Sequence, residues 1–143
     1  MKDTAINASI GTALAAGAFW FLTMWLAPQP ISAFTRWASV VDVKPGQEIT
    51  IYSHNERRGG CDSIIWRSLI SADGKVVLFE PFQTPVRPGG TDDQEFTFNA
   101  PSSFSDGPMI YRVHSEFRCN AIQRWLGGQM FVLPDIIFNY RTT

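Results

Sequence analysis

The chain has 143 residues and a formal net charge of -1, which leaves room for one modest domain and excludes the strong basic excess typical of nucleic-acid-binding proteins. Hydrophobic residues make up 45% of the chain and aromatic residues 13%, and an apolar block at the start precedes a stretch of ordinary globular composition. The two parts are therefore interpreted separately.

Residues 8–27 form an uncharged, largely apolar block that predicts a membrane-spanning helix. At a rise of about 1.5 Å per residue, such a helix would measure roughly 30 Å, the thickness of the hydrocarbon core of a bilayer. Trp25 beside Pro28 lies where an interfacial anchor is expected. We expect residues 1–7 to form a short tail, residues 8–27 a transmembrane helix or signal anchor in contact with the lipid bilayer, and residues 28–37 a linker.

Two other interpretations of this block remain. A cleaved signal peptide would use Lys2 as its basic start and a small-residue site ending at Ala33, but the apolar block is long for such a peptide. A buried core helix would normally carry a more polar face. The retained anchor is favoured, which predicts a single-pass membrane protein with its C-terminal part in the periplasm or outside the cell.

Small residues recur at every fourth position within the same block. Ser9, Ala13 and Gly17 would lie along one helix face, where small side chains permit close packing of helices. This spacing suggests a homo-oligomer formed through the helix.

Residues 38–143 predict a mainly β domain of about seven antiparallel strands. Lys44–Gln47 contains Pro then Gly, and Asp73–Gly74 lies between two apolar runs, so both segments predict tight turns. No long helical pattern interrupts the strand-like runs, which fall at 38–43, 48–54, 61–71, 75–80, 95–99, 109–119 and 130–140.

Alternation of apolar and polar residues selects the side chains expected in the core. Trp66 is the central one, because it lies in the most apolar run. Phe96, Phe98, Tyr111 and Phe138 are expected to face it from later runs.

Cys61 and Cys119 are the only cysteines, and a pair fits one disulfide bond in an oxidising compartment better than a metal site. The two histidines, His54 and His114, add too few ligands at unsuitable spacing for zinc. No metal site is therefore expected.

The strand count and turn placement, with Trp66 on the third run and Tyr111 five residues after Asp106, resemble the immunoglobulin-like or fibronectin-type β-sandwich. The resemblance covers residues 38–141, although the first cysteine starts the third run where the family usually places it on the second. Together with the N-terminal block, the architecture is similar to that of uncharacterised envelope proteins of bacteria and tailed phages.

In that topology the third and sixth runs are antiparallel neighbours, which implies that Cys61 and Cys119 lie at the same end of the sandwich and can bond. The first strand would start at this end too, so the end should face the bilayer. We expect it to form a binding tip for anionic headgroups or an envelope protein partner, with side chains Arg57, Arg58, Arg118, Arg124 and Trp125.

Motifs for catalysis and for cofactor binding are missing from the sequence. There is no nucleophile elbow, zinc-protease motif or phosphate-binding loop before a helix, and the adjacent Asp92 and Asp93 make no carboxylate pair for acid–base work. We therefore expect no enzyme and no cofactor. The predicted function is a membrane-anchored, non-catalytic binding or adaptor module; the alternative is a structural subunit of an envelope assembly, virus particle or phage lysis system.

Overall fold

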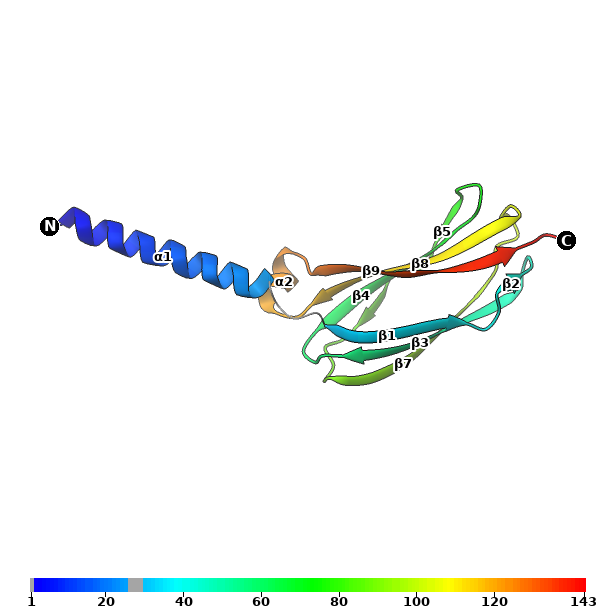
Figure 1. Ribbon diagram of the computed structural model, residues 1–143, viewed down its shortest axis with the longest axis horizontal. Helices are drawn as coiled ribbons and strands as arrows, with labels where there is room; N and C mark the ends of the chain where they lie inside the picture. Colours follow the sequence, from blue (N-terminus) through cyan, green and yellow to red (C-terminus); the bar gives the residue numbers. More distant parts are fainter. Residues whose placement is uncertain (1, 26–29) are drawn as a thin grey trace.

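The computed structural model describes residues 2–25 and 30–143. One long helix, α1 (Lys2–Trp25), projects from the end of the β region at which β1 (Ile31–Ala38) begins, and the C-terminus lies at the opposite end (Figure 1). The first strand starts at Ile31, so the segment predicted as a linker contains a strand. The segment predicted as an N-terminal tail, residues 1–7, is helical from Lys2 onward.

The first of two sheets has three antiparallel strands, in the order β1-β3-β7. The central strand is β3 (Glu48–Arg57), and β7 (Gly90–Asn99) flanks it on the other side. Ile51 of β3 pairs with Ala38 on one side and with Phe96 on the other, and the register between β1 and β3 shifts once, between Ile31 and Ala33.

The second sheet has six strands, in the order β2-β9-β8-β4-β5, with β6 also paired to β4. Only the short β2 pairs in parallel, with the end of β9, and the other pairings are antiparallel. Their bounds are β2 (Asp42–Val43), β4 (Asp62–Ile70), β5 (Val76–Leu78), β6 (Phe82–Thr84), β8 (Gly107–Arg118) and β9 (Gln129–Tyr140).

The two curled sheets face each other and bury a shared apolar core (Figure 1). Ile49 and Phe98 enter it from the three-stranded sheet, and Leu69 and Phe138 from the six-stranded sheet. The Tyr111 ring stacks on Phe98 with ring centroids 5.8 Å apart. The mainly β prediction is confirmed.

Two predicted turns form where glycine was expected to permit them. Gly46 and Gly74 have φ angles of 73° and 81°, in the left-handed region that side chains with a Cβ rarely adopt. In the first turn, the Gln47 amide donates to the Lys44 carbonyl at 3.1 Å. The strand before this turn nevertheless divides: β1 pairs with β3, while β2 crosses to the other sheet and pairs with β9.

The prediction of a single-pass membrane anchor is wrong. Within residues 2–25 and 30–143, the structure contains no helix that is both long enough and apolar enough to traverse a bilayer. The apolar block is rich in alanine, glycine and threonine, which gain little from transfer into hydrocarbon because they bury few carbon atoms. The single-pass localisation predicted from this block is wrong for the same reason. Residues 26 and 27 of the block lie outside the described residues.

Among the predicted core residues, Trp66 is placed differently. Phe98, Tyr111 and Phe138 are buried, and Phe96 is partly buried against the core. Trp66 is only half-buried, because β4 turns Ile65 and Leu69 toward the other sheet and leaves Trp66 on the opposite face. Both faces of this strand carry large apolar side chains, so the alternation of apolar and polar residues predicted the wrong face as the buried one.

Candidate functional site

The predicted tip residues gather at the end of the β region from which α1 projects (Figure 1). Ile31, at the start of β1, pairs with Arg57 at the end of β3. The next amide, that of Arg58, donates to the Pro30 carbonyl at 2.8 Å. The start of the first strand and the first two tip arginines therefore lie together, as strand direction predicted.

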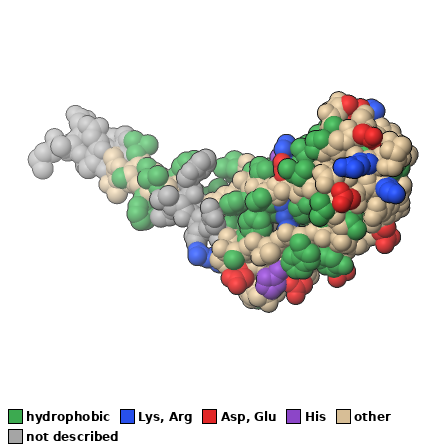
Figure 2. Space-filling view, turned by 45° about the vertical axis from the view of Figure 1, so that its right-hand side comes forward, with side chains coloured by type: hydrophobic (Ala, Val, Ile, Leu, Met, Phe, Trp, Pro, Cys, Tyr) green, Lys and Arg blue, Asp and Glu red, His purple; other side chains and the backbone are tan. Residues whose placement is uncertain are grey.

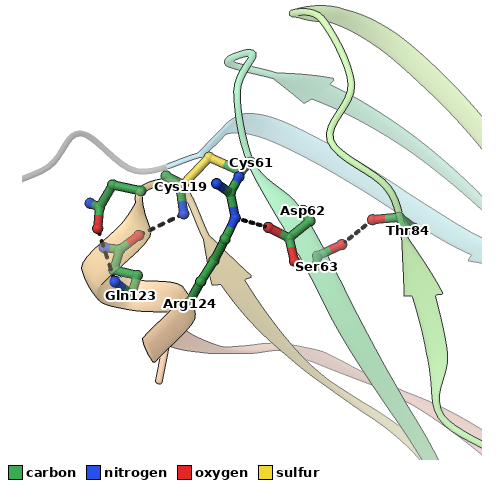
Figure 3. The surroundings of a disulfide bond; sticks show 8 residues. Cys61, Asp62, Ser63, Thr84, Cys119, Gln123 and Arg124 are labelled. Atoms are coloured by element: carbon green, nitrogen blue, oxygen red, sulfur yellow. Dashed lines mark hydrogen bonds and ion pairs between the residues drawn. A yellow bond between two sulfur atoms is a disulfide. The ribbon is translucent and has the colours of Figure 1, made fainter. Parts of the chain in front are cut away.

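A disulfide bond between Cys61 and Cys119 joins the two halves of this end, and the predicted pairing is confirmed (Figure 3). The bond lies just before β4 and just after β8, next to the paired residues Asp62 and Arg118, with Cα atoms 4.0 Å apart. It closes a loop of 58 residues. In the chain-entropy description such a loop is worth about 4 kcal/mol of stability.

Immediately after Cys119, the short helix α2 (Ala121–Leu126) is held in place by side-chain hydrogen bonds (Figure 3). The Asn120 side chain caps its N-terminus by accepting from the Gln123 amide at 2.9 Å. The buried Gln123 side chain in turn accepts from the Cys119 amide at 2.7 Å. We call residues 120–127 the α2 knob.

The chain leaves the α2 knob through two glycines that fix its exit. Gly127 has a φ of 105°, and a Cβ placed on Gly128 would lie 2.2 Å from the Phe117 carbonyl oxygen. The Gly128 amide also donates to the Glu116 side chain at 2.7 Å. A larger residue at position 128 would push the knob away from β8.

Two tip arginines share one carboxylate. The Asp62 oxygens accept from Arg118 Nη2 at 2.6 Å. They also accept from Arg124 Nε at 3.0 Å, the contact drawn in Figure 3. Burial by itself raises the pKa of Asp62, but the hydrogen bond from Arg124 and the charge of Arg118 outweigh it and lower the net pKa. Asp62 therefore stays ionised and neutralises part of the predicted cationic surface.

Arg57 is also engaged within the domain. Its side chain is 9% exposed and forms an ion pair with Asp92 at 2.7 Å, and Arg87 contacts the same carboxylate at 3.2 Å. Burial lowers the pKa of Arg57, partly opposed by the charge of Asp92. Of the predicted tip arginines, only the exposed Arg58 forms no ion pair with another described residue.

The apolar part of the tip is exposed. Trp125 is 82% exposed and Leu126 is 64% exposed, both on the α2 knob. The structure thus brings all five predicted tip residues to one end, but pairs three of the four arginines internally and presents Trp125 outward.

A second feature lies between the sheets, next to the core. A cavity of about 40 Å³ is lined by residues of both sheets, among them Arg36 of β1, Arg57 of β3, Arg67 of β4 and Tyr111 of β8. Sequence reasoning selected neither Arg36 nor Arg67 as a site residue. Burial raises the pKa of Tyr111, although the charges of Arg67 and Arg36 pull it down. Burial lowers the pKa of Arg36.

Elsewhere the surface carries no large patch of one sign on the face drawn in Figure 2, where acidic and basic side chains are intermixed. His54 lies beside Asp93, with Nδ1 2.5 Å from the carboxylate oxygen, and remains exposed. Among the described residues, no group of three metal-ligating side chains comes together.

Comparisons with known proteins give no family for this chain. No family model and no curated protein matches it. Among solved structures, the sporulation control protein Spo0M of Bacillus subtilis aligns at a TM-score of 0.44 and 16% identity, over 77% of this chain and 49% of its own.

Two further solved structures align less extensively. The alkylpurine DNA glycosylase AlkC of Pseudomonas fluorescens has a TM-score of 0.42 and 12% identity, over 76% of this chain and 30% of its own. A β-glucosidase of Listeria innocua has a TM-score of 0.42 and 11% identity, over 76% and 16% respectively. These likenesses indicate no function for this chain.

Proposed function

We propose that this chain is a non-catalytic binding or adaptor module whose contact surface is the α2 knob, with Trp125 at its centre. The observation that carries the proposal is the 82% exposure of Trp125 on a segment fixed by a disulfide bond and side-chain hydrogen bonds. Tryptophan is among the residues that contribute most energy to protein interfaces, and a rigid segment loses little entropy when it binds.

The charges and the apolar surface of the α2 knob indicate which kind of partner would fit it. Arg118 and Arg124 share the single carboxylate of Asp62, which leaves these three side chains with one net positive charge, and Arg58 is exposed at the same end. A protein surface with an apolar pocket and an acidic rim would complement this arrangement, because opposite charges at the rim guide association while the pocket desolvates the ring. The partner we infer is such a protein.

We further infer an immunoglobulin-like arrangement for the β region. It is supported by the strand order, since β1, β3 and β7 correspond to strands A, B and E, and β9, β8, β4 and β5 to G, F, C and C′. In that arrangement the loops before β4 and after β8 lie at one end, the end that variable domains use for recognition. The α2 knob occupies the second of these loops.

A second candidate function is that of a structural subunit, and α1 favours it. Leu14, Phe19 and Leu22 are more than half exposed on a helix that projects from the β region. An apolar surface of this extent commonly marks an interaction site, here with α1 of a second copy. Sedimentation of the full chain would show a concentration-dependent dimer, abolished by Leu14→Lys; a monomer at all concentrations would refute this candidate.

The binding function is tested by a photo-crosslinking residue placed at position 125 of the full chain, with a matched probe at position 37. Trp37 is half exposed on β1 and stacks on Tyr52, so it is a tryptophan site outside the knob. We expect one protein to crosslink at position 125 and not at 37, and the purified protein to bind the chain directly. Equal crosslinking at both positions, or none at 125, would contradict the proposal.

A further inference from the structure

Three arginines from three different strands converge on the cavity between the sheets. Arg36, Arg57 and Arg67 line it, together with the polar side chains of Asn55 and Ser115. Glu95 is the single acidic residue of the lining, and its side chain is exposed. A cavity with this lining is cationic, and its volume of about 40 Å³ exceeds the roughly 10 to 15 Å³ that one water molecule requires.

Two of these arginines form no ion pair with any described residue. Within residues 2–25 and 30–143, Arg57 pairs with Asp92, whereas Arg36 and Arg67 have no carboxylate within ion-pair distance. The charge of Asp135 raises the pKa of Arg36, but the two side chains form no ion pair. The Asp135 oxygens instead accept from Nε and Nη2 of Arg112, at 3.0 and 2.7 Å. Arg36 and Arg67 are both partly buried, and a guanidinium withdrawn from water without a counter-charge is costly, so these groups favour an anion between the sheets.

Donor atoms of the arginines remain without an acceptor. The Nε atoms of Arg36 and Arg57 are both buried and make no hydrogen bond to a described residue, although Arg36 does donate through Nη2 to the Pro134 carbonyl. A buried donor that lacks an acceptor destabilises the folded state, because its hydrogen bonds to water are lost and not replaced. An oxyanion offers several acceptor oxygens at once and would satisfy both.

Two aromatic rings lie against the guanidinium of Arg67. Its central carbon lies 4.3 Å from the ring centroid of Phe96 and 5.7 Å from that of Phe82. A guanidinium over an aromatic ring can still donate through its N–H groups, and Arg67 interacts in this way with the Tyr111 side chain. The Arg36 guanidinium lies 5.9 Å from the centroid of Tyr111, so both arginines approach the same phenol from opposite sheets.

We propose that the cavity between the sheets binds a small oxyanion, a phosphate or a carboxylate group, through Arg36 and Arg67. The lining excludes the other ligand classes: a metal ion would meet three cations and one exposed carboxylate, and an apolar molecule would leave the guanidinium donors unsatisfied. Guanidinium groups bind phosphate and carboxylate in the paired geometry that their donors offer. The site contains no residue of the α2 knob, so it stands apart from the proposed protein contact.

The test is a titration of the full chain with inorganic phosphate and, separately, with acetate, followed by NMR signals of the arginine Nε–H groups at constant ionic strength set with chloride. We expect a saturable shift at Arg36 and Arg67 with a midpoint below about 10 mM for one or both anions. Phosphate alone would assign a phosphate site, and acetate alone a carboxylate site.

Arg67→Met retains the volume beside Phe96 and removes the charge, and should weaken binding by about tenfold or more because it removes charge-assisted hydrogen bonds. Arg67→Lys should recover only part of the affinity, since lysine lacks the paired donors. Arg141→Gln is the matched control, because this exposed arginine lies beyond β9 and outside the cavity lining. If Arg67→Met does not fold, Arg36→Met serves the same purpose.

The proposal is overturned if neither anion gives a saturable shift. It is also overturned if the folded Arg36 and Arg67 variants bind as tightly as the parent, or if Arg141→Gln weakens binding to the same degree. A non-saturable response of the same size with chloride would mean charge screening only.

Discussion

Removal of the disulfide bond should lower the free energy of unfolding by about 4 kcal/mol, the value expected for closure of a 58-residue loop. A small domain is stable by only about 5 to 15 kcal/mol, so this is a large share of the total. The perturbation is the double substitution Cys61→Ala and Cys119→Ala, which removes both sulfur atoms without leaving a reactive thiol. The two Cα atoms are 4.0 Å apart, and neither cysteine belongs to the buried core, so little packing is lost with them.

Urea unfolding measures the effect directly. With an m-value of about 2 kcal/mol per molar urea, a loss of about 4 kcal/mol moves the midpoint down by roughly 2 M. The m-value itself should rise slightly, because the uncrosslinked chain expands further when it unfolds. A midpoint shift below about 0.5 M, with a folded variant, would refute the view that the bond stabilises the domain through loop closure.

Two other predictions follow from packing and from charge. Phe138→Ala should cost about 3 to 5 kcal/mol because Phe138 is fully buried, whereas the half-buried Trp66→Ala should cost clearly less; equal losses in thermal unfolding would contradict the assignment of the faces of β4. The pKa of Asp62 is lower in the folded chain than in the unfolded chain, so its contribution to stability is present above about pH 4 and is lost as the pH falls through the folded-state pKa. Asp62→Asn should therefore reduce stability at pH 7 and flatten the acid limb of the stability curve, and an unchanged acid limb would contradict the role of Arg124 and Arg118.

Local signals in the sequence predicted much of the β region. The turns at Gly46 and Gly74 depend on a backbone conformation that glycine adopts readily, so the residue type itself predicts them. The pairing of Cys61 with Cys119 needed only the absence of other cysteines and a strand order in which β4 and β8 are neighbours.

Features that depend on two sheets at once could not be predicted this way. Arg36 and Arg67 lie 31 positions apart on different sheets, and each stands beside a tryptophan in a strand with many apolar residues, a local pattern that indicates no ligand site. Their convergence on Tyr111 follows from the curl and packing of the sheets, which hydrophobic alternation does not encode. The prediction of which face of β4 is buried was wrong for a related reason. Ile64, Ile65 and Trp66 place apolar side chains on both faces, so alternation does not distinguish them.

The ion pairs at the tip also could not be predicted from the sequence. Arg118 and Arg124 were expected to present their charge outward, but Asp62, 56 and 62 positions earlier in the chain, lies beside both once β4 pairs with β8. Because these arginines are paired, the candidate contact surface is the exposed Trp125 of the α2 knob and not a group of free cations.

The most direct test of the binding function is the dissociation constant of the crosslinked partner for the Trp125→Ala chain, compared with the parent and with Trp37→Ala. Both substitutions remove an exposed indole, and only the first removes one from the α2 knob. We expect Trp125→Ala to raise the dissociation constant by about thirtyfold or more, the effect of losing a central interface tryptophan, and Trp37→Ala to change it less than about twofold. Equal affinities for Trp125→Ala and the parent would show that the α2 knob is not the contact surface.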